Sequence, residues 1–350
     1  MMKYSIKIIL INLLIALLFV TLIELIFGYW FDKDNFGPYL REHRLKKNPV
    51  VLNYGNETYD FIYKRNYHAF RGNEIDPSKI KAVIVGGSTT EERYKPHKLT
   101  ITGNLNSLLK DRNYDFEIIN AGILGQSTIG HIYNFKYWFP KLKGFSPKLY
   151  IFYIGINDLV LDEEMFINDN FGDIKSIKKL EAFFDNLKNR SFFVERITIL
   201  KQKYYLTDKK MKYDHNYFHG KDISNYKYIN YEKALEIHDI NYLKSKYQKK
   251  IKNYLHRVES LNKHAINKSA LPIFINQVMY DGLKNEILFI INYSLIEYCK
   301  KKKIACIDLA MKFDGKLEYW FDEIHTTGLG SKIIANTIIN ELVEIIDNET

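Results

Sequence analysis

An aspartate and a histidine lie three residues apart in the segment WFDEIHTTG, which covers residues 320–328. An imidazole that donates a hydrogen bond to a carboxylate is held in one tautomer, and its other ring nitrogen can then accept a proton. Asp322 and His325 therefore indicate general-base chemistry of the kind that activates a hydroxyl nucleophile.

A candidate for that hydroxyl is Ser88, in the segment GGSTTE at residues 86–91, which follows a short apolar run. Glycines permit a tight turn from a strand into a helix, and the serine N–H would then point toward a developing oxyanion. A plain turn is the alternative for such a short motif. The segment does not fit the phosphate-binding loop, which requires a lysine followed by serine or threonine.

Two further turns offer hydrogen-bond donors. Gly125 lies in the segment NAGILGQST at residues 120–128, where a glycine lets a backbone N–H approach a reacting centre closely. Asn157 lies in the segment GIND at residues 155–158 and carries a side-chain amide donor. The alternatives are a tight turn around Gly125 and a helix cap at Asn157.

A repeating pattern of strands and helices is expected to position these residues. Continuous apolar runs predict strands that are covered on both faces, at residues 81–85, 116–119, 149–154, 271–275 and 304–309. Helices are predicted between them, at residues 102–110, 130–139 and 285–302. The alternation predicts an α/β fold: a doubly wound, flavodoxin-like parallel sheet of five strands with helices on both faces. Ligands bind such sheets at the carboxyl ends of the strands.

In order and spacing, the four segments resemble the SGNH hydrolase family, the GDSL-like esterases and lipases, over roughly residues 81–160 and 270–345. The resemblance implies Ser88, Asp322 and His325 as a catalytic triad. It implies an oxyanion hole formed by the N–H groups of Ser88 and Gly125 and the amide of Asn157. No metal or organic cofactor is implied.

One position departs from the family pattern. Where the family has Gly-Asp-Ser, this chain has Gly-Gly-Ser, with Gly87 in place of the aspartate. The aspartate is not a triad member, so the chemistry is expected to survive. The departure bears on the rigidity of the turn and on substrate preference.

Residues 8–31 are almost wholly apolar and long enough for a helix that crosses a bilayer. Lys3 and Lys7 precede this run, which favours an N-terminus on the cytoplasmic side. A cleaved signal peptide is the alternative, but the run is too long and lacks a small-residue cleavage site. We therefore expect residues 1–31 to be a single-pass anchor in the cytoplasmic (inner) membrane, with an extracytoplasmic or periplasmic catalytic domain. Glu24 is expected to be an interfacial carboxylate.

The rest of the chain is expected to divide at residue 80. Residues 32–80 lack clear periodicity and are interpreted as a stalk and packing segment, and residues 81–350 as the SGNH-like domain. Within this domain, about residues 161–269 exceed a single crossover and are expected to be a mostly helical insertion.

The formal net charge of +10 is concentrated in one region, because residues 201–270 hold 16 Lys and Arg against 7 Asp and Glu. Such a region is either a solvated surface or a contact for anionic lipid or acidic polysaccharide. An extracytoplasmic location argues against a nucleic-acid partner.

Two residue pairs are interpreted as having no chemical role. His215 and His219 lie four positions apart without an acidic third ligand, so surface histidines are favoured over a metal site. Cys299 and Cys306 are predicted on a helix and the strand that follows it, and two buried free thiols are favoured over a disulfide.

The expected function is that of an extracytoplasmic serine esterase that acts on O-acyl groups, above all O-acetyl groups, of cell-envelope or exported polysaccharide. Expected partners are an acylated carbohydrate or lipid ester, the membrane, and other proteins of envelope polysaccharide modification. An O-acyltransferase with the same triad is one alternative, and a non-catalytic binding or assembly protein of the same fold is another.

Overall fold

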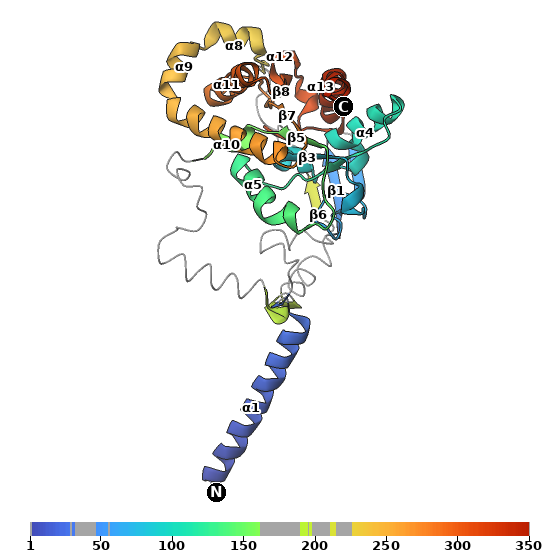
Figure 1. Ribbon diagram of the computed structural model, residues 1–350, viewed down its shortest axis with the longest axis vertical. Coiled ribbons are helices and arrows are strands. Elements are labelled where there is room, and N and C mark those ends of the chain that lie inside the picture. The colour runs from blue at the N-terminus through green and yellow to red at the C-terminus, as the bar shows by residue number, and fades with distance from the viewer. Residues whose placement is uncertain are drawn as a thin grey trace. The chain divides into compact units, whose positions relative to one another are not determined.

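Figure 1 shows the computed structural model of the chain, which describes residues 2–28, 30–31, 47–54, 57–161, 190–194, 196–197, 211–214 and 226–349. The chain divides into two compact units. The first comprises residues 1–42 and 170–210, and the second comprises residues 43–169 and 211–350. All of the predicted site residues belong to the second unit.

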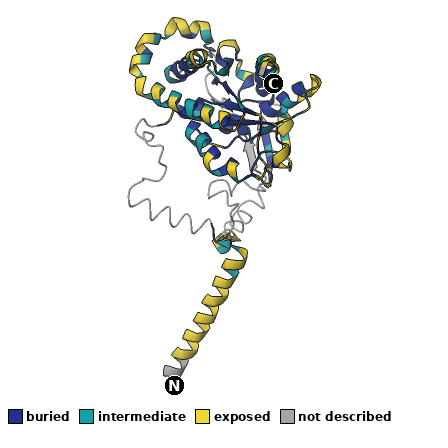
Figure 2. Ribbon diagram, viewed as in Figure 1, coloured by how far each residue is buried: buried dark blue, intermediate teal, exposed yellow. Residues whose placement is uncertain are grey.

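The first unit contains α1 (Met2–Phe27), whose stretch Ile6–Phe27 has a mean hydropathy of 2.8. The side chains of this stretch are largely exposed (Figure 2), and the helix is long and apolar enough to cross a membrane. Near its end, the Glu24 carboxylate accepts hydrogen bonds from Ser191 Oγ at 2.5 Å and from Phe192 N–H at 2.9 Å. The carboxylate expected at the interface is therefore bound by a segment distant in the sequence.

The second unit is built on a five-stranded parallel sheet in the order β4-β3-β5-β7-β8. This is the 2-1-3-4-5 order of flavodoxin-like folds, and it confirms the predicted fold class. Each predicted run overlaps a strand: β3 (Ala82–Gly86), β4 (Ile118–Asn120), β5 (Leu149–Tyr153), β7 (Leu271–Ile275) and β8 (Ala305–Ile307). All residues of β3 and β5 are buried, because helices cover both faces.

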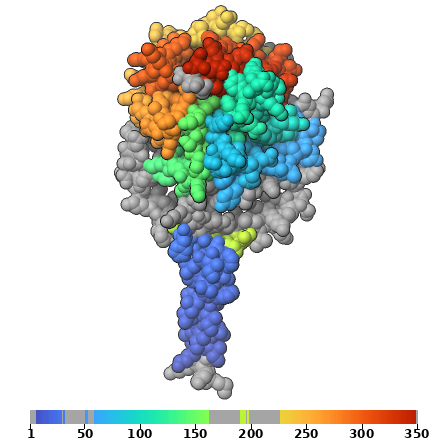
Figure 3. Space-filling view, turned by 45° about the vertical axis from the view of Figure 1, so that its right-hand side comes forward, coloured from blue at the N-terminus to red at the C-terminus, as the bar shows by residue number. Residues whose placement is uncertain are grey.

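Two groups of helices cover the sheet. One group packs together on one face and consists of α5 (Thr128–Tyr133), α10 (Gln248–Ile266) and α11 (Glu286–Lys302). On the other face α4 (Ile101–Asp111) and α13 (Gly328–Glu349) lie side by side (Figures 1 and 3). This division follows from right-handed crossovers, because the chain moves one way along the sheet to reach β4 and the other way to reach β5, β7 and β8.

Shorter helices join these elements. The α-helical ones are α3 (Ser88–Glu91), α8 (Tyr231–Ile237), α9 (Ile240–Lys246) and α12 (Leu309–Lys312), and η3 (Asn134–Trp138) is a π-helix. Single 3-10 turns are η1 (Pro77–Lys79), η2 (His97–Leu99), η4 (Phe139–Lys141), η5 (Ile156–Asp158) and η7 (Leu317–Tyr319). The described residues 226–269 of the predicted insertion are mostly helical, and α10 among them is the crossover helix between β5 and β7.

A second sheet, which the sequence analysis did not predict, lies in the same unit. It has the order β2-β1-β6, with β1 (Lys47–Tyr54), β2 (Glu57–Lys64) and β6 (Met211–Asp214). β1 pairs antiparallel with β2 and parallel with β6. The segment predicted as stalk and packing region therefore contains a hairpin. The available signal was in β2, where Tyr59, Phe61 and Tyr63 place an aromatic residue at every second position.

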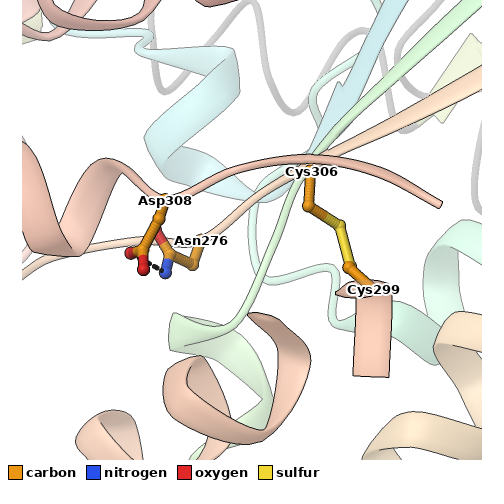
Figure 4. Close-up of a disulfide and its surroundings, with 4 residues drawn as sticks. All are labelled: Asn276, Cys299, Cys306 and Asp308. Atoms are coloured by element: carbon orange, nitrogen blue, oxygen red, sulfur yellow. Dashed lines mark hydrogen bonds between the residues drawn. A yellow bond between two sulfur atoms is a disulfide. The ribbon is translucent and has the colours of Figure 1, made fainter. Parts of the chain in front are cut away.

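Cys299, in the last turn of α11, and Cys306, in β8, form a disulfide (Figure 4). The interpretation of these residues as two free thiols was therefore wrong. Lys303 ends the helix in the left-handed conformation, with φ of 57°, and turns the chain back so that β8 begins beside the helix end. The Cα atoms of the two cysteines are consequently 6.2 Å apart, within the usual range for a disulfide.

We expect the denatured, unreduced protein to show no free thiol, and both cysteines to react after reduction. Cys306→Ser should lower the free energy of unfolding by about 2 kcal/mol, because the disulfide restricts the unfolded chain. The double variant Cys299→Ser/Cys306→Ser is the matched control for the thiol left by the single change. Two free thiols in the unreduced protein would contradict the pairing.

Candidate active site

Ser88 is the first residue of α3, at the carboxyl end of strand β3. The N–H groups of Thr90 and Glu91 both donate to the Gly87 carbonyl oxygen, at 3.1 and 2.9 Å, which closes the turn that begins the helix. Ser88 itself is 6% exposed. The turn therefore holds the serine at the edge of the sheet where ligands of this fold class bind.

Asp322 and His325 lie on the loop between η7 and α13 and are hydrogen-bonded, with 2.7 Å between Asp322 Oδ2 and His325 Nδ1. The other carboxylate oxygen of Asp322 accepts the N–H groups of Ile324 and His325, at 2.9 and 2.8 Å. Burial opposes ionisation of Asp322, but these hydrogen bonds and the charge of His325 together lower its pKa below the usual value. His325 Nε2 is buried and has no hydrogen-bond partner among the described residues.

The loop that carries His325 lies against the turn that carries Ser88, because His325 and Thr89 line the same small cavity. The structure records no hydrogen bond between Ser88 Oγ and His325 Nε2. Catalytic hydrogen bonds of this kind often tighten only when substrate binds. The arrangement provides a buried hydroxyl, and near it an imidazole with one nitrogen oriented by a carboxylate and the other unoccupied.

The two other predicted hydrogen-bond donors, the Gly125 N–H and the Asn157 amide, lie on adjacent turns. Asn157 Nδ2 donates to the Gln126 carbonyl oxygen at 2.8 Å, so its turn is bonded to the turn that contains Gly125. Gly125 adopts a φ of +73°, which favours glycine, and a Cβ there would meet nothing within 4 Å. The second N–H of the Asn157 amide is left for another acceptor.

Gly87 is in contact with the Asn157 amide. A Cβ at Gly87 would lie 1.9 Å from Asn157 Nδ2 and 2.9 Å from the Gln126 carbonyl oxygen. Any side chain at this position would thus displace the amide or the backbone beside it. Glycine at position 87 therefore leaves room for the Asn157 amide, a contact that the sequence alone did not reveal.

A buried ion pair braces the turns that contain Gly125 and Asn157. Arg257 of α10 contacts Asp158 with 3.2 Å between Nη2 and Oδ1, and its Nε donates to Thr128 Oγ1 at 2.6 Å. Thr128 also donates its N–H and hydroxyl to Asp158. Burial raises the pKa of the Asp158 carboxyl, while Arg257 and the Thr128 hydrogen bonds oppose that shift. These contacts join the start of α5 and the end of η5 to α10.

Gln277, just after β7, connects the nucleophile turn to the Asn157 turn. Its Nε2 donates to Thr89 Oγ1 at 2.8 Å, and its Oε1 accepts the Ile156 N–H at 2.8 Å. One buried amide thus fixes Thr89 and Ile156, which are the chain neighbours of the predicted site residues Ser88 and Asn157. Gln277 was not among the predicted site residues, although its position two residues after a predicted strand was a usable signal.

Lys95 joins the nucleophile segment to the histidine loop. Its buried ammonium donates to Glu92 Oε1 at 2.8 Å, to Ser331 Oγ at 2.7 Å and to the carbonyl oxygens of Thr326 and Thr327. Burial lowers the pKa of Lys95, and Glu92 opposes that shift. The ammonium needs the Glu92 carboxylate in this position, because a buried charge without a partner of opposite charge is costly.

The segment before β3 supports the same region. Arg71 is buried and donates to the carbonyl oxygens of Glu92 at 2.7 Å and Lys95 at 2.6 Å. Arg65 pairs with the Glu91 carboxylate at 3.1 Å, and the Tyr63 hydroxyl donates to that carboxylate. Residues that the sequence analysis assigned to a packing segment therefore hold the chain just after the predicted nucleophile.

Metal ligands are not gathered at this site. The described residues contain no group of three or more His, Cys, Asp or Glu that could hold a metal ion. His215 and His219 lie outside the described residues.

The chain shows a distant similarity to solved structures of known proteins. No family model and no curated protein matches the sequence. The chain is similar to a solved member of the lipolytic protein G-D-S-L family from Veillonella parvula, at 14% identity and a TM-score of 0.40, over 75% of this chain and 97% of that one. It is also similar to Axe2, an acetylxylan esterase from Geobacillus stearothermophilus, at 11% identity and a TM-score of 0.42, over 75% and 96% of the two chains. The proposed function rests on the residues of the site and not on this similarity.

Lys95→Met is expected to lower the free energy of unfolding by about 3–5 kcal/mol, because Glu92 would remain buried without its cation. Lys95→Met/Glu92→Gln should recover much of that loss, since the second change removes the unpaired charge. Urea unfolding of the purified chain in detergent measures both. A cost below about 1 kcal/mol for the single variant, in the range of surface pairs, would contradict the assigned role.

Gly87→Ala and Asn157→Ala are expected to be non-additive. Asn157→Ala should slow ester hydrolysis roughly a hundredfold if its amide serves an oxyanion. Gly87→Ala should cause much of the same loss by displacing that amide, yet add little in the Asn157→Ala background. Measurement of kcat for the four members of this cycle tests the contact, and independent, multiplicative effects would contradict it.

Proposed function

We propose that this chain is a serine ester hydrolase with Ser88 as nucleophile, His325 as general base and Asp322 as the group that orients His325. One observation carries the proposal. His325 Nδ1 is bound to Asp322 at 2.7 Å, while its Nε2 is buried, lacks a partner among the described residues, and belongs to a loop packed on the Ser88 turn. A ring held in this way accepts a proton at Nε2.

The proposed reaction is acyl transfer in two steps. Ser88 Oγ attacks the ester carbonyl carbon while its proton passes to His325 Nε2, and the alcohol leaves with that proton as acyl-Ser88 forms. Water then attacks acyl-Ser88 and gives a proton to His325, which passes that proton to Ser88 Oγ as the acid leaves. The N–H groups of Ser88 and Gly125 and the Asn157 amide are proposed to bind the oxyanion, each contributing on the order of 3 kcal/mol in the transition state.

The cavity beside His325 is small. Leu52 and Tyr59 of the β1–β2 hairpin, together with Tyr94 and Phe321, line this cavity. It leaves room for about one water-sized group, and Ser88, Gly125 and Asn157 do not line it. The proposed acetyl group therefore rests on the resemblance to SGNH esterases and not on the volume of this cavity.

The proposed compartment is extracytoplasmic, with α1 as a membrane anchor. The apolar helix and the lysines before it favour this topology. The Cys299–Cys306 disulfide supports it independently, because disulfides persist in oxidising compartments and are rare in the cytoplasm. The proposed substrate is accordingly an O-acetyl ester of envelope or exported polysaccharide.

The full-length protein in detergent should hydrolyse p-nitrophenyl acetate, and Ser88→Ala should abolish turnover while leaving the thermal unfolding transition unchanged. Thr89→Ser is the matched control, because it alters the neighbouring hydroxyl without removing it. Longer-chain esters should react more slowly, as expected for an enzyme whose substrates are acetyl esters. Undiminished hydrolysis by Ser88→Ala would reject the nucleophile.

The products formed from an acetylated oligosaccharide should then show whether water or a sugar hydroxyl accepts the acetyl group. Free acetate is expected for an esterase. Acetyl groups that appear on an added sugar, with little free acetate, would instead identify the chain as an O-acyltransferase using the same residues.

A further inference from the structure

A group of exposed lysines gathers at the edge of the main sheet where its strands begin. We call it the amino-edge patch, and it consists of Lys148, Lys263, Lys268 and Lys300–Lys303. β5, β7 and β8 are neighbours, and each begins within three residues of a patch lysine. The starts of neighbouring parallel strands share one edge of the sheet, and the Ser88 turn lies at the opposite edge.

Contacts between the elements place these lysines on one surface. Lys263 Nζ lies 3.0 Å from Glu259 Oε1. This hydrogen bond is the main cause that lowers the pKa of Glu259, and the charges of Lys263 and Lys302 lower it further. The Leu271 N–H donates to the Lys148 carbonyl oxygen at 2.8 Å, so the starts of β5 and β7 are in contact.

Positive charge in the patch is largely uncompensated. Among the described residues, Glu259 is the only carboxylate that forms an ion pair with a patch lysine. Other lysines of the same helical layer are paired, since Lys244 contacts Glu297 and Lys246 contacts Glu286, each at 2.6 Å. The excess charge is therefore concentrated where α10 and α11 end.

The disulfide holds four of these lysines in place. Lys300–Lys303 lie between Cys299 and Cys306, and the Lys303 N–H donates to the Cys299 carbonyl oxygen. Helix C-termini favour lysine, which accounts for part of this run. It does not account for Lys148, which precedes a strand. A fixed loop of like charges also loses little conformational freedom when it binds an anionic surface.

We propose that the amino-edge patch docks on anionic phospholipid headgroups of the membrane that α1 anchors in, so that the active-site edge faces away from the bilayer. This inference rests on the proposed anchoring. A lysine near a surface of anionic lipid is attracted to it, so the seven lysines of the patch carry a charge complementary to such a surface. Residues 32–46 span at most roughly 50 Å, which keeps the second unit within reach of that surface.

Docking in this orientation deepens the assignment of the substrate. The carboxyl edge of the sheet, with Ser88 and Asn157, then opens toward polymer outside the membrane. Ester bonds of lipids in the same bilayer lie at the opposite edge of the domain. The orientation thus selects polysaccharide esters over lipid esters.

Lysine labelling of the full chain in nanodiscs tests the docking. One set of discs contains phosphatidylcholine alone, and the other contains phosphatidylcholine with phosphatidylglycerol. We expect an amine-reactive reagent to modify Lys300–Lys303 roughly fivefold less in the anionic discs. Labelling of Lys316, an exposed residue after β8, should not change, and high salt should remove the protection.

Two matched variants locate the effect. Lys301→Gln/Lys302→Gln/Lys303→Gln should abolish the protection of Lys263 and Lys268. A control that removes the same charge elsewhere, Lys233→Gln/Lys284→Gln/Lys316→Gln, should retain it.

Equal labelling in both kinds of disc would overturn the proposal. Protection by an added acidic polysaccharide, with none from anionic lipid, would also overturn it and identify a polymer contact. Failure of the chain to enter either disc would reject the anchor and the docking together. Hydrolysis of p-nitrophenyl acetate in the same discs tests the proposed function separately, so a failure of the docking proposal can be distinguished from a failure of the proposed function.

Discussion

The candidate site depends on one buried ammonium group. Lys95 follows the predicted nucleophile by a few residues, and it bonds to Thr326, which lies 231 positions away and next to His325. Because a buried ammonium must be satisfied, its hydrogen bonds fix the distance between the two segments. Glu92 supplies the opposite charge and also accepts the N–H that begins α4. The imidazole and the hydroxyl are therefore held by a polar core rather than by their own loops.

Buried polar contacts also hold the turns that contain Gly125 and Asn157. Asp158 and Arg257 form a buried pair that joins two strand-end turns to α10, and Gln277 joins one of those turns to the nucleophile turn. Each tie lies at the carboxyl edge of the sheet. Preorganised donors of this kind stabilise developing charge without reorganising during the reaction. The two halves of the site can thus act as one rigid environment.

Much of the fold and of the candidate site follows from local sequence signals. Apolar runs gave the five strands, and turn residues after them pointed to Ser88, Gly125 and Asn157, because these signals depend on a few neighbouring residues. Lys95 depends on contacts with a segment 231 positions away, which periodicity does not contain. The disulfide joins cysteines only seven residues apart, but it requires the helix end and the strand start that Lys303 brings together. Gly87 is a mixed case, since its departure from the family motif was visible but its cause, the Asn157 amide, was not.

The central claim is a covalent acyl-Ser88 intermediate. It is tested most directly by mixing the full chain with p-nitrophenyl acetate, quenching with acid within one turnover, and mapping the modified peptide by mass spectrometry. The account predicts one acetyl group on Ser88, formed as fast as the first equivalent of p-nitrophenolate and absent from His325→Ala. Steady turnover with no acetyl group on Ser88, or with the acetyl group on another residue, would contradict it.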